Sequence, residues 1–342
     1  MTIGETLTPW TERASRLRPD GRSLIGGERT SALSGRTRPT TNPATGSALA
    51  ELAACGAEDV DRAVAAARRA QPAWAAMGAE GRKEALLGWA AVLEQHSMEL
   101  ALLESLDSGR PVLQTSTVDV PGAISCLRWY AEAADKLAGE LPAVPPGAVA
   151  QVSREPLGVV AAIVPWNFPL EIAAWKLGPA LASGNTVVLK PAEQTSLSTL
   201  RAAELAVEAG LPAGVLNVVT GSGREVGTAL AHHMDVDALA FTGSTGVSRT
   251  LLEASGRSNL KRLSLEAGAR ARTSSLPIPA TSRRPPRRQR SAPTTTTARS
   301  ARRTPASWSS GPSTTTSCSS WPRRRRATGR PTRSRGLQGT GP

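Results

Sequence analysis

The sequence predicts an α/β fold built on a doubly wound parallel sheet, and three observations lead to this prediction. Short apolar runs of strand length alternate with helical patterns over residues 158–268. The first run, Val159–Val164, is apolar at every position, as in strands that are buried on both faces. It ends in a Pro-Trp-Asn-Phe-Pro break, and a helical pattern starts directly after it. Alternation of this kind gives parallel strands joined by right-handed crossovers.

Residues 1–140 are predicted to form an N-terminal arm and an α-helical part of the same domain. The first 38 residues are polar and weakly patterned, which indicates an extended arm with one short strand near Leu24-Ile25. A turn cluster follows at Thr41–Gly46. Asp59 is predicted to cap the first of four helices. The spacing of apolar residues places these helices around residues 59–67, 86–93, 100–106 and 124–137.

Residues 158–268 are predicted to be the core of a Rossmann-like domain. The expected strands are Val159–Val164, Thr186–Lys190, Val215–Val219, Ala238–Phe241 and Arg262–Glu266. Helices are expected between them, near residues 170–182, 196–209, 224–233 and 247–255. A helix break and a lone strand are expected within residues 141–157. Sheets of this kind most often bind a nucleotide at the carboxyl ends of their strands.

The formal charge of +13 originates in the last part of the chain. Residues 269–342 contain 17 Arg and no Lys, Asp or Glu. Removing those 17 from the 41 basic residues leaves 24 against 28 acidic ones, a net charge of −4 for residues 1–268. We therefore expect neither a specific nucleic-acid partner nor a membrane surface for this larger part. No apolar run approaches the roughly 20 residues of a membrane span.

The cysteines exclude some chemistry and suggest a compartment. Cys55, Cys126 and Cys318 have neither metal-site nor CxxC spacing, so we expect no metal or redox site. Cys55 and Cys126 are expected to be structural. Few cysteines and the absence of a signal-peptide pattern predict a cytoplasmic protein.

Five short motifs follow one another along the predicted sheet. They are PWNFP at Pro165–Pro169, KPAE at Lys190–Glu193, GSG at Gly221–Gly223, FTGST at Phe241–Thr245 and LEAG at Leu265–Gly268. In order and spacing they resemble the aldehyde dehydrogenase family, from about Pro39 to Gly268. Together with LEAG, the RWYAE segment at residues 128–132 is most similar to the branch that acts on aminoaldehydes such as γ-glutamyl-aminobutyraldehyde. The resemblance implies NAD as cofactor, an aldehyde as small-molecule substrate, and a homo-oligomer to which the strand segment 141–157 contributes.

Two residues match catalytic positions of that family, in which a cysteine thiolate attacks the aldehyde, hydride passes to NAD and water hydrolyses the thioester. Asn167 matches the amide that donates to the oxyanion, and donors of this kind contribute about 3–4 kcal/mol. Glu266 matches the general base that activates the water. Without the resemblance, Asn167 is a turn residue that bonds its own backbone. Glu266 is then a strand-end acid paired with Lys261 or Arg262.

The resemblance also implies a set of cofactor contacts. Lys190 matches the lysine that bonds the adenosine ribose hydroxyls. Glu193 can accept from the 2′-hydroxyl and would repel a 2′-phosphate, which favours NAD over NADP. The alternative is that Lys190 and Glu193 are solvated side chains on a loop. The other expected contacts are Ile163, Pro165, Trp166, Gly223, Gly227, Phe241, Gly243, Ser244 and Val247.

Glycines mark the two turns that the resemblance assigns to the pyrophosphate. Gly221, Gly223 and Gly227 open a helix after a strand, where backbone amides can meet phosphate. A glycine triad also suits close packing of a helix on a strand, so both interpretations stay open. At the second turn, Ser248 stands where the family usually has glycine.

Beyond Gly268 the composition changes abruptly. Residues 269–342 contain no Val and a single Ile, Ile278, among runs of Arg, Ser, Thr and Pro, so we expect a disordered tail. Where the resemblance places the nucleophilic cysteine, this chain has Ser300. The catalytic domain that follows in the family is therefore expected to be missing.

Our hypothesis is that a one-base frameshift near Gly268 accounts for this change; the alternative is a genuine basic, disordered arm. A GC-rich gene for AHVVLAD, read one base late, gives the RTSSLP of Arg272–Pro277, and one for YYNNGEVC gives the segment Thr294–Ser300. We therefore expect a chain inactive in aldehyde oxidation. One alternative is a non-catalytic protein that binds NAD or a partner. Another is a nucleic-acid-binding protein that uses the Arg-rich tail, although no RNA- or DNA-binding motif accompanies it.

Overall fold

A seven-stranded sheet organises the computed structural model, which describes residues 3–268, with side chains from residue 10 onward. The strand order is β2-β1-β7-β6-β5-β8-β9. The last five strands in this order run parallel, as predicted. They are β5 (Val159–Ile163), β6 (Thr186–Lys190), β7 (Leu216–Val218), β8 (Ala238–Ser244) and β9 (Arg262–Gly268). Each predicted strand is therefore present, with ends that differ by at most three residues.

An antiparallel hairpin extends the sheet at the β7 edge, so the sheet is mixed. Strands β1 (Ser23–Ile25) and β2 (Glu28–Thr30) pair with each other, and Leu24 pairs with Val218 of β7. Gly26 and Gly27 both have positive φ and form the tight turn between the strands. The strand predicted at Leu24-Ile25 is confirmed. The extended arm was wrong, because helix α1 (Ile3–Arg16) precedes this hairpin.

A second, separate hairpin carries the predicted turn cluster. Strands β3 (Thr37–Thr41) and β4 (Ala48–Ala53) pair antiparallel as a two-stranded sheet. Asn42 begins the turn between them, accepting through its side chain from Ala44 N at 2.9 Å. Such local bonding is the reason Asn is common at turns.

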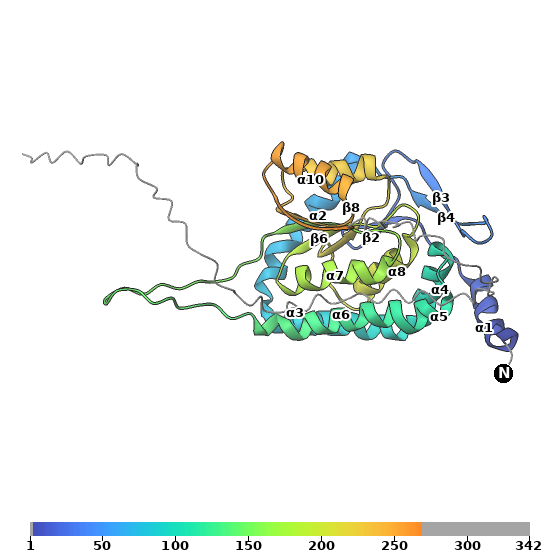
Figure 1. The fold of residues 1–342 in the computed structure, drawn as a ribbon, viewed down its shortest axis with the longest axis horizontal. Coiled ribbons are helices and arrows are strands. Elements are labelled where there is room, and N and C mark those ends of the chain that lie inside the picture. Colours follow the sequence, from blue (N-terminus) through green and yellow to red (C-terminus); the bar gives the residue numbers. More distant parts are fainter. Residues whose placement is uncertain (1–2, 269–342) are drawn as a thin grey trace, which may run out of the picture. The chain divides into compact units, whose positions relative to one another are not determined.

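Helices cover the main sheet in layers, which Figure 1 shows. On one face lie α2 (Ala57–Ala76), α9 (Thr228–His232) and α10 (Thr245–Gly256), with the π-helical turn η3 (Gly223–Gly227) leading into α9. On the other face lie α7 (Pro169–Ala182) and α8 (Leu197–Glu208). An outer layer packs on these two: α3 (Gly78–Gln95), α4 (Ser97–Ser108) and α6 (Val120–Ala133). Three short turns complete the helices: α5 (Val112–Gln114), η1 (Thr115–Asp119) and η2 (Ala134–Lys136).

The predicted cap of α2 needs a correction. Gly56 is the N-cap residue and Asp59 lies three residues further along, inside the first turn. From there its carboxylate accepts from Gly56 N at 3.1 Å and from Leu33 N at 3.0 Å. An acid at this position still offsets the unpaired amides of a helix start. The carboxylate therefore stabilises the start of α2 from within the helix.

Alternate residues of the central strands enter two different cores. Val160 and Ala162 of β5 pack towards α7 and α8, whereas Val159 and Ala161 pack towards α2 and α9. Because successive side chains of a strand point to opposite faces, a strand covered on both faces must be apolar throughout. This is why β5 appears in the sequence as an uninterrupted apolar run.

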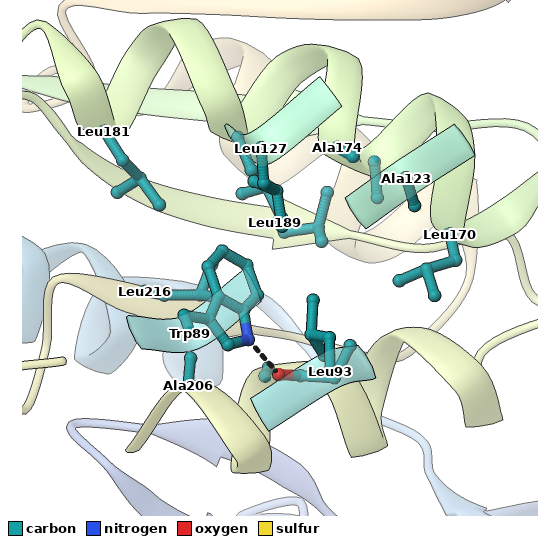
Figure 2. Close-up of a cluster of buried hydrophobic side chains, with 14 of the residues drawn as sticks. Trp89, Leu93, Ala123, Leu127, Leu170, Ala174, Leu181, Leu189, Ala206 and Leu216 are labelled. Atoms are coloured by element: carbon teal, nitrogen blue, oxygen red, sulfur yellow. Dashed lines mark hydrogen bonds between the residues drawn. The ribbon is translucent and has the colours of Figure 1, made fainter. Parts of the chain in front are cut away.

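Trp89 joins the outer helical layer to the inner one. Its side chain is 1% exposed and packs among Leu93, Leu127 and Leu216, as Figure 2 shows. The indole N–H donates to the carbonyl oxygen of Ala202 on α8 at 2.9 Å. A buried tryptophan usually needs such a partner for its N–H. Trp89 therefore fixes α3 against α8 by packing and by one hydrogen bond.

The segment of residues 141–157 contains no named strand, contrary to the prediction of a lone strand. It extends away from the sheet as a long loop in Figure 1. Only an isolated bridge joins Glu140 to Val152, with N···O distances of 3.1 and 2.8 Å. Pro142, Pro145 and Pro146 lack the amide donors that a longer ladder would need. A role for this segment in oligomer formation stays a prediction.

Two findings concern membranes and the end of the chain. Within residues 3–268, no helix is long and apolar enough to cross a membrane. The predictions for residues 269–342, Ser300 included, lie outside the described residues.

We expect Trp89→Ala to lower the free energy of unfolding by about 3–5 kcal/mol, because it removes a large buried side chain together with its hydrogen bond to Ala202 O. Urea denaturation followed by circular dichroism measures the change. Trp129, which is 64% exposed on α6, provides the control, and Trp129→Ala should change stability by less than about 0.5 kcal/mol. Equal effects of the two substitutions would contradict the role given to Trp89.

Candidate active site

Four parallel strands are paired in register near one edge of the sheet, where β5 and β6 end and β8 and β9 continue for three more residues. Ile163 of β5 pairs with Lys190 of β6 on one side and with Phe241 of β8 on the other, and Phe241 pairs with Leu265 of β9. This row brings together the ends of segments that are far apart in the sequence. Most of the predicted site residues lie on it or just beyond it, where α/β sheets bind ligands.

Lys190 and Glu193 lie against the glycine turn of the next crossover. Lys190 is 3% exposed, and its Nζ donates to Pro191 O at 3.1 Å. Glu193 Oε1 accepts from Gly223 N at 2.8 Å. A Cβ added to Gly227 would lie 3.9 Å from Lys190 Cδ. The structure therefore brings these four predicted residues together, and the solvated-loop alternative was wrong for Lys190.

The charges of this cluster are tuned by burial and by contact. Burial lowers the pKa of Lys190 to about 8, with the charge of Arg38 acting in the same direction and that of Glu193 opposing it. Burial alone would raise the pKa of Glu193. Hydrogen bonds from Gly223 N and Arg38, together with the charge of Lys190, outweigh burial and hold that pKa below its usual value. Glu193 is therefore a stable carboxylate.

The turn between β8 and α10 contains three of the expected cofactor contacts. Ser244 is the N-cap of α10, and its Oγ accepts from Val247 N at 3.3 Å. A Cβ on Gly243 would lie 2.4 Å from Phe241 Cζ, so only glycine fits beside this buried ring. Ser248, the departure from the family pattern, is 5% exposed and donates to Ser244 O at 3.2 Å. Its hydroxyl is thus bonded to the backbone of the helix start.

The loop between β5 and α7 presents Trp166 and Asn167 on its surface. Trp166 is 59% exposed and Asn167 is also exposed, while Ile163 and Pro165 below them are half-buried. Within residues 3–268 the Asn167 amide makes no hydrogen bond, so the alternative of a self-bonded turn is not observed. Phe168, the next residue, anchors the loop.

The anchor is a stacked arginine held by a buried acid. The guanidinium carbon of Arg110 lies 4.1 Å from the centroid of the Phe168 ring. Asp119, whose side chain is fully buried, accepts from Arg110 Nε at 2.6 Å and from Nη2 at 3.0 Å. This paired contact orients the guanidinium plane.

Two buried carboxylates on α4, which the sequence analysis missed, fix the helices that follow the site loops. Glu104 Oε2 accepts from Leu170 N at 3.2 Å at the start of α7, and from the Ser198 hydroxyl at 2.8 Å. Asp107 Oδ2 accepts from Leu197 N at 2.9 Å at the start of α8. Each acid thus bonds an amide that a helix start leaves unpaired. Their i, i+3 spacing directly after the apolar run Leu100–Leu103 was the available signal.

Burial raises the pKa of both carboxyls. It raises the pKa of Glu104 to about 7, and the charge of Asp119 adds to the shift against the bonds from Ser198 and Leu170. It raises the pKa of Asp107 to about 6 against the bonds from Leu197 N and the Thr40 hydroxyl. Among residues 3–268, Glu104 Oε1 has no hydrogen-bond partner.

Glu266 lies apart from this cluster, on a groove of about 910 Å³ beside α7 and the adjacent face of β8 and β9. The carboxylate is exposed, and Lys176 of α7 lines the same groove. Burial lowers the pKa of Lys176, and the charge of Glu266 opposes that shift. Asn167 does not line this groove.

The pairing of Glu266 with Lys261 or Arg262, the alternative drawn from the sequence, is not observed. Lys261 Nζ instead donates to Ala231 O at 2.7 Å and to Ser258 Oγ at 2.9 Å. Over the described range, neither basic residue forms an ion pair with Glu266.

Neither described cysteine is a thiolate at neutral pH. Burial raises the pKa of Cys55 to about 11, and its Sγ lies 3.3 Å from Ser23 Oγ. Burial raises the pKa of Cys126 to about 11 as well, with a further contribution from the charge of Glu171. Because the thiolate is the nucleophilic form, neither residue replaces the cysteine expected at Ser300.

The fold and the residues at its strand ends are those of an α/β dinucleotide-binding domain. The model of the aldehyde dehydrogenase family matches residues 30–274, and the chain belongs to this family.

Relatives of known name are closely similar over the same part. The chain is 49% identical over 267 residues to the NADP/NAD-dependent aldehyde dehydrogenase PuuC of Escherichia coli (strain K12), covering 78% of this chain and 54% of that protein. It is 52% identical over 251 residues to aminoacetaldehyde dehydrogenase of Pseudomonas aeruginosa, covering 73% and 51%. The chain thus spans about half the length of these relatives.

Solved structures agree in fold. Gamma-glutamyl-gamma-aminobutyraldehyde dehydrogenase from Burkholderia cenocepacia J2315 superposes with a TM-score of 0.75 at 53% identity, over 77% of this chain and 53% of that one. An indole-3-acetaldehyde dehydrogenase solved in complex with NAD+ gives a TM-score of 0.75 at 51% identity, over 76% and 53%.

We expect Glu104→Gln to remove part of the pH dependence of stability. The pKa of Glu104 is raised on folding, so its contribution is fully present below the unfolded value of about 4.5 and is lost as pH rises through about 7. Between pH 4.5 and pH 8 the free energy of unfolding of the wild type should therefore fall by about 3 kcal/mol relative to that of the variant. Urea denaturation across this range measures the difference.

Glu94→Gln is the matched control for this titration. Glu94 is exposed, and a hydrogen bond from Arg128 lowers its pKa, so removing it should not reproduce the trend. Parallel stability curves for the wild type and Glu104→Gln would show that Glu104 does not titrate as described.

Proposed function

We propose that this chain binds NAD at the carboxyl edge of its sheet, in the manner of a family whose members oxidise aldehydes to carboxylic acids. The observation that carries the proposal is the contact set of Lys190, Glu193, Gly223 and Gly227 beyond the ends of β6 and β7. Lys190 Nζ makes one hydrogen bond within residues 3–268 and keeps further donors for ribose hydroxyls. Glu193 can accept from the 2′-hydroxyl.

A cavity beside this cluster supports the assignment. It has a volume of about 350 Å³, and its lining includes Trp166, Glu193 and Thr195. The Thr195 hydroxyl is buried and lacks a hydrogen-bond partner in the described part of the chain. A buried polar group without a partner is uncommon in native structures, and a bound polar ligand would satisfy it. Gly243, Ser244 and Val247 would approach the cofactor from the other side of the β5 loop.

The aldehyde half of the reaction needs groups other than those that would bind NAD. When bound, the nicotinamide supplies the hydride acceptor. Asn167 offers an amide for the oxyanion, and Glu266 offers a carboxylate that can take a proton from water. Neither group forms a bond to the aldehyde carbon, which needs a thiolate. Ser300 stands where the resemblance places that thiolate. Cys55 is buried and Cys126 is half-buried, and both thiols have a raised pKa. We therefore propose that the chain has background activity only.

The assembly proposed by resemblance is a homo-oligomer in which residues 141–157 take part. Leu141 and Val149 of this segment are 76% and 90% exposed. Exposed apolar side chains on a projecting loop would be covered in such an assembly.

Titration calorimetry with NAD tests the proposed site in the full chain. We expect saturable binding, and Lys190→Met should weaken it about tenfold or more, because a charged donor to the ribose is lost. Lys136→Met, which removes a lysine with 64% side-chain exposure, should leave the affinity unchanged. An absence of heat with the folded wild type would overturn the nucleotide site. Aldehyde-dependent NADH formation above background would overturn the proposed inactivity alone.

The coding DNA tests the frameshift that we infer near Gly268. We expect the frame that is shifted by one base to encode, in register, a continuation typical of the family, including a cysteine that overlaps the codons of Ser300 and Ala301. Sequencing of the gene from the source organism decides the matter. A shifted frame that is interrupted by stop codons or encodes no such continuation contradicts the hypothesis.

A further inference from the structure

Arg38 of β3 reaches the proposed ribose pocket, and Arg36, just before that strand, contacts the neighbouring glycine turn. Arg38 of β3 is bonded to the Glu193 carboxylate, and Arg36 Nη2 lies 3.2 Å from Glu225 Oε1. The two residues are two positions apart on an extended segment, so their side chains leave the same face. No motif singled out either arginine, since β3 lies more than 150 residues before Glu193 in the sequence.

Arg38 is available for a further ligand. Its side chain is 48% exposed. It lines the cavity of about 350 Å³ that also contains Trp166 and Thr195. It also lines a smaller one of about 120 Å³ beside Ser222 and Glu225. A guanidinium has five N–H donors in a planar fork, and the contact with one carboxylate oxygen leaves several of them free.

Glu193 by itself would select against a 2′-phosphate. Its carboxylate is held in place by Gly223 N at 2.8 Å and cannot turn away without losing that bond. A dianionic phosphate beside it would meet strong repulsion at short range. The bonded guanidinium cancels that charge locally and provides donors with the geometry that phosphate oxygens prefer. In dinucleotide-binding folds, an arginine near the ribose is the feature that accommodates the 2′-phosphate of NADP.

We propose that Arg38 is a specificity-determining residue that makes the ribose pocket accept 2′-phosphorylated dinucleotides as well as NAD. The inference rests on the proposed function, because it takes Lys190 and Glu193 as the ribose contacts. Arg38 turns from the Glu193 carboxylate towards the 2′-phosphate when NADP binds. With NAD it stays on Glu193, whose second oxygen remains on Gly223 N. The preference for NAD that Glu193 alone predicts is therefore reduced.

Calorimetric titration of the full chain with NAD and with NADP tests this role. We expect the wild type to bind NADP within about tenfold of NAD. Arg38→Ala should weaken NADP binding about tenfold or more and change NAD binding by less than about threefold, since only the phosphate loses charged donors. Arg38→Lys, which keeps the charge but not the fork, should give an intermediate loss.

Matched variants separate a local role from a general loss of charge. Arg128→Ala removes an exposed arginine that forms an ion pair with Glu94 on the outer helices, and it should alter neither affinity. Glu193→Gln combined with Arg38→Ala should recover NADP binding, because the repelling carboxylate is gone. Circular dichroism checks that each variant is folded. If Arg38→Ala does not fold, the comparison of NADP and NAD binding is made with Arg38→Lys.

The outcomes distinguish this inference from the proposed function. NAD binding together with NADP binding more than about 100-fold weaker in the wild type overturns the role of Arg38 and leaves the NAD site standing. Equal losses for both dinucleotides in Arg38→Ala overturn it as well, since they indicate a structural role. A wild type that binds neither dinucleotide overturns both proposals.

Discussion

Two buried carboxylates on α4 hold the two halves of the candidate site in position relative to each other. Glu104 and Asp107 are three residues apart and therefore lie on the same side of one helix. One bonds the first turn of α7, the other the first turn of α8. Asn167 lies just before α7, and Glu193 lies just before α8. A single turn of the outer layer thus helps to set the distance between Asn167, the proposed oxyanion donor, and Glu193, the proposed ribose contact. Substituting either acid by alanine leaves a backbone amide without its side-chain partner, which is a costly change.

The sequence predicted the parts of this structure whose signal is local. A strand covered on both faces needs apolar residues throughout, so β5 and β6 were found almost to the residue. Helix periodicity identified the buried face of α3, with Trp89 among its members. Periodicity states which face is buried but not what covers it. The contact of Arg38 with Glu193 joins residues 155 apart, and that of Glu104 with Ser198 joins residues 94 apart. No spacing rule connects such pairs.

The two halves of the site differ in how many of their polar groups have a hydrogen-bond or charge partner among the described residues. On the proposed nucleotide side, the charges of Lys190, Glu193 and Arg38 shift one another's pKa values or are paired, and Glu193 accepts from Gly223 N of the glycine turn. On the aldehyde side, Asn167 keeps an amide without a partner within residues 3–268, and Glu266 stands exposed on a groove. A preorganised donor contributes to catalysis only when the reacting group is held against it. If the proposed assignments hold, residues 3–268 supply the ribose contacts, and the aldehyde side needs a second surface.

In the mechanism that the resemblance implies, that second surface supplies a thiolate. The two described cysteines do not supply it, because burial raises the pKa of both thiols. A thiol in apolar surroundings is disfavoured as an anion, and both Cys55 and Cys126 have a raised pKa for this reason. The nearby charge of Glu171 raises the pKa of Cys126 further. A reactive cysteine instead needs partial exposure and a positive neighbour. Lys176 and Arg262 are the described cations that line the groove of Glu266. In the proposed function, dinucleotide binding therefore rests on residues 3–268, whereas aldehyde oxidation needs a thiolate that Cys55 and Cys126 do not supply.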